Sequence, residues 1–194
     1  MLGGPSVAVS KGAWAALKAD FRANAPNLSD PPRRDELVRE LARNVPTVRF
    51  AAVALLRFSQ AVGRRVPLGG SVLKQLNHML TGCDFAYQAD VGPGLVLYHP
   101  TGIVVGPNCR IGARARIMQG VTIGSDAVIV GDSAGRSPEI GDHVFVGPGA
   151  VVVGAVSLGD HVQVGANAVV TSSFGDGVVV AGAPARVIRR LDGV

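Results

Sequence analysis

The feature that most constrains this chain is a six-residue repeat that runs from Val105 to Thr171. An aliphatic residue heads each hexapeptide, and the phase resumes after one interruption: Val105, Ile111, Ile117 and Ile123, then Ile140, Val146, Val152, Leu158, Val164 and Val170. Four positions later stands a small or aliphatic residue, such as Cys109, Ala115 or Val144. A helix would need a period of 3.6 and a strand a period of two. A period of six with two inward positions predicts a triangular prism of short parallel strands, one hexapeptide per face.

Glycines follow the repeat closely. A glycine comes directly after the aliphatic residue in two hexapeptides of every three, whereas Met118, Val153 or Thr171 stands there in the third. Val153 and Thr171 are 18 positions apart, which is the length of one three-faced coil. Because glycine adopts positive φ at little cost, we interpret this regular supply as the tight corners of the prism.

Composition agrees with a narrow solenoid. Of the 194 residues, 47% are hydrophobic but 5% are aromatic, and a narrow prism admits Val, Ile and Ala more readily than large rings. No apolar run reaches the roughly 20 residues of a membrane span, and the amino terminus shows no secretory signal peptide. Cys83 and Cys109 form no CxxC motif. The lack of a long apolar run predicts that no segment spans a membrane. The lack of a signal peptide and of paired cysteines predicts a reducing, cytoplasmic location.

The chain before the repeat is expected to be helical. Leu37, Leu41 and Val45 recur at helical spacing up to Pro46. Further helices are predicted at about 13–21, 48–62 and 72–80, with Pro67 and Gly69-Gly70 closing the one at 48–62.

These patterns divide the chain into three parts: a helical lobe at 1–81, a solenoid at 82–180 with an inserted loop near 125–138, and a carboxy-terminal tail at 181–194.

Positive charge is concentrated at the start of the chain, where residues 1–66 hold 11 Lys and Arg against 5 Asp and Glu. A basic segment can bind nucleic acid or anionic lipid, but no aromatic residues are interleaved with these charges. A solvated helix face is favoured, and no nucleic-acid partner is expected.

One histidine stands where the repeat slips. Val91, Leu97 and Ile103 keep the six-residue spacing, and the phase then shifts by two at Val105. His99 lies in this slip and is expected to face outward, where a solenoid corner needs no histidine. An imidazole there can accept a proton from an attacking hydroxyl or amine, although a plain surface histidine is the alternative.

The segment 82–106 resembles the entry to the solenoid in serine O-acetyltransferases, members of the hexapeptide-repeat (left-handed β-helix) acyltransferase family, and in related enzymes that modify sugars or other small molecules. That family pairs a histidine in an H-x-T-G-I-V-V-G motif with an aspartate fifteen residues earlier. Here His99 heads the motif and Asp84 stands fifteen residues before it. The resemblance extends to Arg186 and implies a mainly β fold, a left-handed parallel β-helix with a small amino-terminal helical lobe.

The resemblance also implies a reaction, the direct transfer of an acetyl group from acetyl-CoA. His99 would deprotonate the hydroxyl (or amine) of a small-molecule acceptor, which attacks the thioester, while Asp84 would hold the imidazole and stabilise its positive charge. A turn or capping aspartate is the alternative for Asp84. A longer acyl chain or a carrier-protein donor stays open.

Two departures from the family concern the acceptor. Serine acetyltransferases carry an aspartate before the catalytic histidine, where this chain has Tyr98, and their loop ends in Arg-His-Pro, where this chain reads Arg136-Ser137-Pro138. We expect Tyr98, Arg136 and Ser137 to contact the acceptor, and the changes favour a hydroxyl compound other than free L-serine, with serine as second choice.

For CoA, the family's backbone contacts at hexapeptide corners match Pro148 and Ala166. Arg186, with Arg189 or Arg190, is expected to meet the phosphates, although a basic tail that merely ends the solenoid is the alternative for the last two. Because the family shares its site between neighbouring chains, a homotrimer is expected. Pairing of trimers through the lobe stays open.

Two of the remaining histidines raise the question of a metal site. His143 and His161 lie 18 positions apart in matching Gly-Asp-His-Val contexts, so they are expected to stack on one corner. Stacked imidazoles are candidate zinc ligands. The solenoid carbonic anhydrases use a His-x4-His pair that is missing here, and no metal is expected. A metal-dependent lyase and a non-catalytic scaffold are the disfavoured alternatives.

Overall fold

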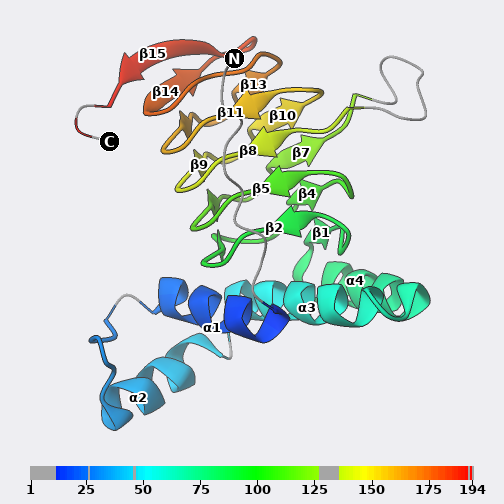
Figure 1. Ribbon diagram of the computed structural model, residues 1–194, viewed down its shortest axis with the longest axis vertical. Coiled ribbons are helices and arrows are strands. Elements are labelled where there is room, and N and C mark those ends of the chain that lie inside the picture. The colour runs from blue at the N-terminus through cyan, green and yellow to red at the C-terminus, as the bar shows by residue number, and fades with distance from the viewer. Residues whose placement is uncertain (1–11, 26, 46, 127–135, 192, 194) are drawn as a thin grey trace.

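The computed structural model describes residues 12–25, 27–45, 47–126, 136–191 and 193. Figure 1 shows two parts, a layer of helices at one end and a stack of short strands that rises from it. The helices are α1 (Ala13–Asn24), α2 (Arg34–Asn44), α3 (Val48–Gly63) and α4 (Pro67–Thr81). The expected helical lobe is therefore present. None of the described helices is by itself long and apolar enough to span a membrane, although the bent pair α2–α3 passes by length and composition together.

The fourth helix differs from the expectation that it begins near residue 72. It begins at Pro67, because proline at the first helical position loses no hydrogen bond. Gly69 and Gly70 lie inside the helix rather than before it. A Cβ on Gly70 would lie 2.6 Å from the Cα of Gly63 in α3. These glycines therefore serve the close approach of α3 and α4, which a reading of glycine as a helix breaker misses.

Three sheets form the faces of the prism, and their strands are parallel except for the last pair of sheet C. Sheet A holds β1 (Asp84–Phe85), β4 (Val104–Val105), β7 (Thr122–Gly124), β10 (Val151–Val153) and β13 (Val169–Val170). Sheet B holds β2 (Asp90–Val91), β5 (Arg110–Ile111), β8 (Glu139–Ile140) and β11 (Ser157–Leu158). Sheet C holds β3 (Val96–Leu97), β6 (Arg116–Ile117), β9 (Phe145–Val146), β12 (Gln163–Val164), β14 (Val178–Ala181) and β15 (Arg186–Arg190). Successive strands visit the three sheets in turn, so the prism has an A/B, a B/C and an A/C edge.

The repeat's inward positions form the core. The aliphatic residues that head the hexapeptides are buried, with Ile111, Ile117 and Ile123 at 0% exposure. The second inward position is buried as well, for example at Cys109 and Val121. The expectation of one stacked aliphatic core with two inward residues per hexapeptide is confirmed.

The repeat glycines have a different role from the one expected. On sheets B and C, those that follow the aliphatic residue lie where the next coil stacks closely: a Cβ on Gly112 would lie 2.5 Å from the carbonyl carbon of Gly141, and one on Gly147 would lie 2.8 Å from the nitrogen of Ala166. Positive φ occurs at other positions, such as Gly120 at 69°. Close stacking of coils, rather than corner dihedrals, explains the glycines on sheets B and C.

The last segment closes sheet C. β14 runs parallel to β12, and β15 turns back to pair antiparallel with β14. Residues 186–190, expected as part of a tail, are therefore a strand on the end of the solenoid. All five residues of this strand are exposed.

Candidate functional site

His99 stands on an enlarged corner of the first coil. That coil spans 20 residues from Asp84 to its partner Val104, whereas the next spans 18 residues from Val104 to Thr122. The two additional residues fall between β3 and β4, on the A/C edge. His99 is exposed there with a φ of 51°, an uncommon conformation for a residue other than glycine. The phase slip in the sequence is thus a physical bulge that presents an imidazole.

Asp84 begins the strand that lies below this corner. Its backbone N–H donates to the carbonyl oxygen of Ile103 at 2.8 Å, and the N–H of Gly102 donates to the carbonyl oxygen of Gly82 at 2.9 Å. Phe85 points into the core, so the alternation of a strand turns Asp84 outward. The structure therefore brings Asp84 and His99 to the same edge of the same coil.

The partner of Asp84 in this structure is a lysine. Lys74 of α4 forms a salt bridge with the Asp84 carboxylate, and both side chains are about one-third exposed. No hydrogen bond joins Asp84 to His99 among the described residues. Sequence reasoning missed Lys74, although one signal was available: it is the single Lys, Arg, Asp or Glu within Pro67–Thr81.

Tyr98 is covered by a second cation of the lobe. The guanidinium carbon of Arg49, near the start of α3, lies 5.6 Å from the centre of the Tyr98 ring, within reach of a cation–π interaction. Arg49 also donates to the side-chain oxygen of Asn44 at 3.3 Å. The position next to His99 therefore carries an aromatic ring beneath a positive charge.

Arg136 and Ser137 lie on a different edge from His99. They follow the inserted loop that connects β7 to β8, on the A/B edge, and residues 127–135 of that loop lie outside the described residues. Asp126 holds the base of the loop by accepting from the Arg136 backbone at 2.8 Å and from its guanidinium at 3.3 Å. Within one chain, sheet A separates Arg136 and Ser137 from His99.

Pro148 and Ala166 lie on the same edge as His99. The corners of successive coils are joined there by backbone hydrogen bonds, from Gly149 to Gln119 and from Asn167 to Pro148, both at 2.9 Å. Pro148 is partly exposed and Ala166 is exposed. This edge runs from the imidazole towards the coil end that carries β15, a path along which an extended cofactor such as CoA can lie.

The expected phosphate ligands are on β15. Arg186 and Arg189 are exposed, and Arg186 donates to the carbonyl oxygen of Ala185 at 2.7 Å. They belong to the same sheet that borders the His99 edge, at its far end. The structure thus separates them from His99 along the length of the solenoid.

The other histidines stack as expected. The rings of His143 and His161 lie 4.7 Å apart between centres and 12° from parallel, on the B/C edge. Partial burial, followed by the charges of His161 and Arg114, lowers the pKa of His143. In the described part of the chain, no three His, Cys, Asp or Glu side chains gather in a way that could hold a metal ion.

The two thiols are core residues. Burial, and then the charge of Asp84, raises the pKa of Cys83 to about 12. Burial likewise raises the pKa of Cys109 to about 11. Neither thiol is available as a thiolate nucleophile near neutral pH.

A buried ion pair fixes the lobe to the first coil, and sequence reasoning missed it. Arg57 of α3 and Asp20 of α1 are almost fully buried and meet at 2.7 Å. Arg57 also donates to the carbonyl oxygens of Val91 and Gly92, and Asp20 accepts from the N–H groups of Gly94 and Leu95. Buried charges are tolerated when each is paired and hydrogen-bonded in this way. The cluster fixes α3, which carries Arg49, against the first coil, and α4, which carries Lys74, packs closely on α3.

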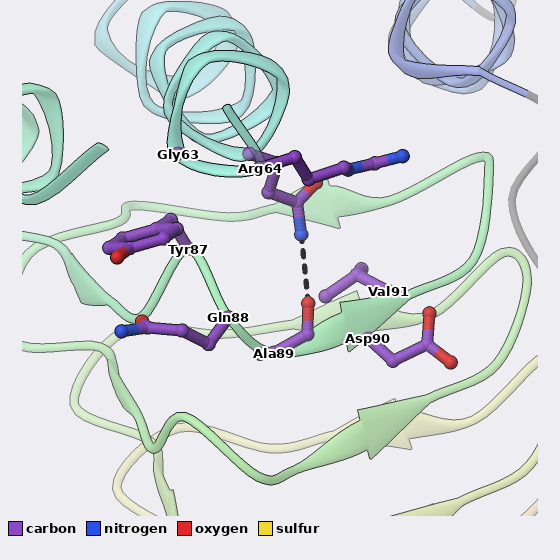
Figure 2. A pocket seen from close by; sticks show the side chains of 8 residues that line it. Gly63, Arg64, Tyr87, Gln88, Ala89, Asp90 and Val91 are labelled. Atoms are coloured by element: carbon purple, nitrogen blue, oxygen red, sulfur yellow. Dashed lines mark hydrogen bonds between the residues drawn. The ribbon is translucent and has the colours of Figure 1, made fainter. Parts of the chain in front are cut away.

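A pocket of about 470 Å³ lies elsewhere, between the end of α3 and the A/B edge. Figure 2 shows Tyr87 beside Gly63 beneath this helix, with a side-chain amide that donates to the carbonyl oxygen of Ala89. That amide belongs to Gln60, at 2.9 Å. The pocket contains none of the expected site residues.

Two family models match the solenoid. Residues 137–172 match the bacterial transferase hexapeptide (six repeats), and residues 102–131 match the hexapeptide repeat of succinyl-transferase. Together they cover most of the stack that was assigned from the six-residue period.

The proteins of similar sequence and the solved structures of similar fold are serine acetyltransferases. A serine acetyltransferase of Staphylococcus xylosus is 35% identical over 119 residues, 61% of this chain and 54% of that protein. The chain spans about half the length of the curated relatives it matches. A serine acetyltransferase from Brucella abortus in complex with coenzyme A is 29% identical with a TM-score of 0.76, covering 92% of this chain and 68% of that one. A soybean serine acetyltransferase complexed with serine is 28% identical with a TM-score of 0.76, covering 92% and 70%.

Proposed function

This chain is a serine acetyltransferase-like hexapeptide-repeat protein, and from that premise we propose that it transfers an acetyl group from acetyl-CoA to a hydroxyl group of a small molecule. The proposal rests on the arrangement of residues along the A/C edge of the prism. There the two-residue bulge presents His99 next to the strand of Asp84, at one end of a line of corners that includes Pro148 and Ala166.

The chemistry assigned to this edge is general-base catalysis. His99 takes the proton of the acceptor hydroxyl as its oxygen attacks the thioester carbonyl. A carbon–oxygen bond forms, the carbon–sulfur bond breaks, and the imidazolium returns the proton to the departing thiolate. Asp84 stabilises the imidazolium, and the salt bridge with Lys74 holds Asp84 in place.

Two acceptor classes are supported by different observations. The relatives are serine acetyltransferases, which favours free serine as the acceptor. They give no support to the expectation that the acceptor is a compound other than serine. The surroundings of Tyr98 favour a hydroxyl compound without an ammonium group, because Arg49 puts a positive charge where an ammonium would need an anion. We propose the second class, which includes neutral sugars, as the acceptor and keep serine as the alternative.

A homotrimer is part of the proposal, and sheet A supports it. The outward residues of sheet A include Val104, which is 42% exposed, together with Val151 and Val169, whereas those of sheet B include Arg110 and Glu139. If sheet A faces a threefold axis, the His99 edge of one copy meets the Arg136 edge of the next. The acceptor site is then completed between copies.

Three finer assignments belong to the same proposal. We propose left-handed coils, as the family resemblance implies, and the division into a lobe, a solenoid and a tail at 1–81, 82–180 and 181–194. A cytoplasmic setting is proposed because acetyl-CoA is the donor.

Release of CoA thiol in the presence of acetyl-CoA tests the function. The panel is serine, homoserine, amino sugars and neutral sugars, and we expect a neutral sugar or another hydroxyl compound to exceed serine. Fastest turnover with serine would select the alternative acceptor. No thiol release above hydrolysis with any hydroxyl compound would reject the proposed function.

His99→Ala is the matched variant. We expect it to lower kcat by a factor of about 10²–10⁴, because a general base is lost. The His99 side chain is exposed and does not pack in the core, so the circular dichroism spectrum of the variant should match that of the wild type. His78→Ala, an exposed histidine of α4, is the control and should keep full activity. Near wild-type turnover by His99→Ala would contradict the assignment.

A further inference from the structure

A second cavity opens on the B/C edge, away from His99. Its volume is about 510 Å³, and it lies between α1 and the first two coils. All of its charged lining residues are arginines: Arg22 from α1, and Arg114 and Arg116 from the second coil. The remaining lining is small or apolar and includes Pro93 and Val96.

Small residues create this space on a fixed frame. α1 faces it with Ala19 and Ala23. A Cβ on Gly94 would lie 3.1 Å from the Cγ of Arg114, so the glycine leaves room for the arginine stem to lie over it. The N–H of Gly94 is held at 2.7 Å by Asp20, which the buried pair with Arg57 fixes in turn. The cavity wall is therefore preorganised rather than a gap between mobile segments.

Arg114 sits in a conformation that costs energy. Its φ is 57°, and the left-handed region costs a residue with a Cβ roughly 1 kcal/mol, less for asparagine and nothing for glycine. Gly94 occupies the equivalent corner of the coil below. The turn itself gains nothing from an arginine, so the side chain at this corner has to be explained by what it contacts.

The positive charge of the cavity is only partly compensated. Arg22 meets the exposed Asp30 at 3.2 Å. Among the salt bridges of the described residues, none involves Arg114 or Arg116. Arg114 also acts on its neighbour, since its charge contributes to the lowered pKa of His143. Arg114 and Arg116 thus line the cavity without a salt bridge, and the nearby Asp142 carboxylate instead accepts a hydrogen bond from the backbone N–H of Ala113 at 2.7 Å.

We propose that this cavity binds a small phosphate monoester, with the phosphate between Arg114 and Arg116 and an apolar or ring-bearing body against Pro93, Val96 and the alanines of α1. Guanidinium groups match phosphate oxygens through paired, charge-assisted hydrogen bonds. The volume exceeds that of a bare phosphate and suits a molecule of nucleoside monophosphate size. The site does not depend on the proposed acetyl transfer. In a trimer around sheet A, the B/C edge points outward and stays open.

Isothermal titration calorimetry of the full chain at physiological ionic strength tests the proposal. The probes are AMP, inorganic phosphate and adenosine, each with and without saturating CoA. We expect AMP to bind, phosphate to bind more weakly, and adenosine to give no heat. Arg114→Gln combined with Arg116→Gln should weaken AMP binding about tenfold or more, because both phosphate ligands are lost.

Arg110→Gln is the control. This arginine is also exposed on the second coil but pairs with Glu139 on sheet B, so AMP binding should be unchanged. Three results would overturn the proposal: displacement of AMP by CoA, which would assign the phosphate to the cofactor site, equal weakening by the control, or no AMP binding by a wild-type protein with a native circular dichroism spectrum.

Discussion

At the scale of single residues, the lobe reaches the proposed catalytic pair through one side chain. Lys74 holds Asp84 from α4, and Asp84 is the group assigned to stabilise the His99 imidazolium. The salt bridge fixes the position of the Asp84 carboxylate at the start of β1. The geometry of the proposed pair is therefore set partly from outside the solenoid.

Replacing this lysine should lower kcat and leave KM unchanged. In Lys74→Met the Asp84 carboxylate loses its salt-bridge partner and is no longer held in one position, so we expect kcat to fall while the KM for acetyl-CoA stays at the wild-type value. Lys74→Arg keeps the salt bridge and should restore most of the wild-type kcat. Equal kcat in all three proteins would show that Lys74 does not position Asp84.

His143 makes stability depend on pH. Its pKa is lowered in the folded chain, so the unfolded chain binds more protons between the folded value and about 6.5. Stability is therefore complete above that range and is lost as the pH falls through it. We expect urea midpoints to drop from pH 7.5 to pH 5.5, and His143→Asn, which also suits a positive φ, to reduce the drop. An unchanged drop in the variant would assign the effect to other groups.

At the scale of elements, the repeat is held by close stacking of coils. The glycine after each aliphatic residue lies against the backbone of the next coil on sheets B and C. On sheet A the same position is open, since nothing lies within 4 Å of a Cβ on Gly124. The sequence period therefore marks two kinds of glycine that only the packing distinguishes.

This difference predicts unequal costs for one substitution. Gly112→Ala would place a methyl group 2.5 Å from the backbone of Gly141, and we expect a loss of about 2 kcal/mol or more in unfolding free energy. Gly124→Ala meets no neighbour and should change stability by about 0.5 kcal/mol or less. Chemical denaturation measures both. Equal losses would mean that coil spacing relaxes freely.

At the scale of the whole molecule, the two edges of sheet A carry the two halves of the proposed site. His99 lies on the A/C edge, and the base of the inserted loop with Arg136 lies on the A/B edge. One copy cannot bring them together, because the sheet lies between them. Activity should therefore require association.

A charge on the outward face of sheet A tests this requirement. We expect Val151→Asp to convert trimers to monomers in analytical ultracentrifugation and to lose activity in parallel, because an unpaired carboxylate would be buried in the interface. Ser157→Asp on sheet B is the control and should leave the mass unchanged. A Val151→Asp monomer with full turnover would separate activity from assembly.

Much of the fold follows from the sequence because its signals are local. The six-residue period dictates which side chains face inward, and the slip between Leu97 and Val105 marks the bulge that presents His99. The pairing of Asp84 with His99 was implied by the family resemblance, and the structure places Asp84 at the start of β1 and His99 in the corner that leads to its partner strand β4. The inward positions and the bulge can be predicted because each depends only on repeats that are neighbours in the sequence.

The remaining features depend on segments that meet only in the folded chain. Lys74 on Asp84, Arg49 over Tyr98 and the buried Asp20–Arg57 pair each join the lobe to the first coil. No period predicts such pairs, because the geometry between a helix and a coil is set by packing and by the pairing of buried charges. The prism and the position of His99 can thus be read from the six-residue period, whereas the charges around His99 depend on how the helices pack on the first coil.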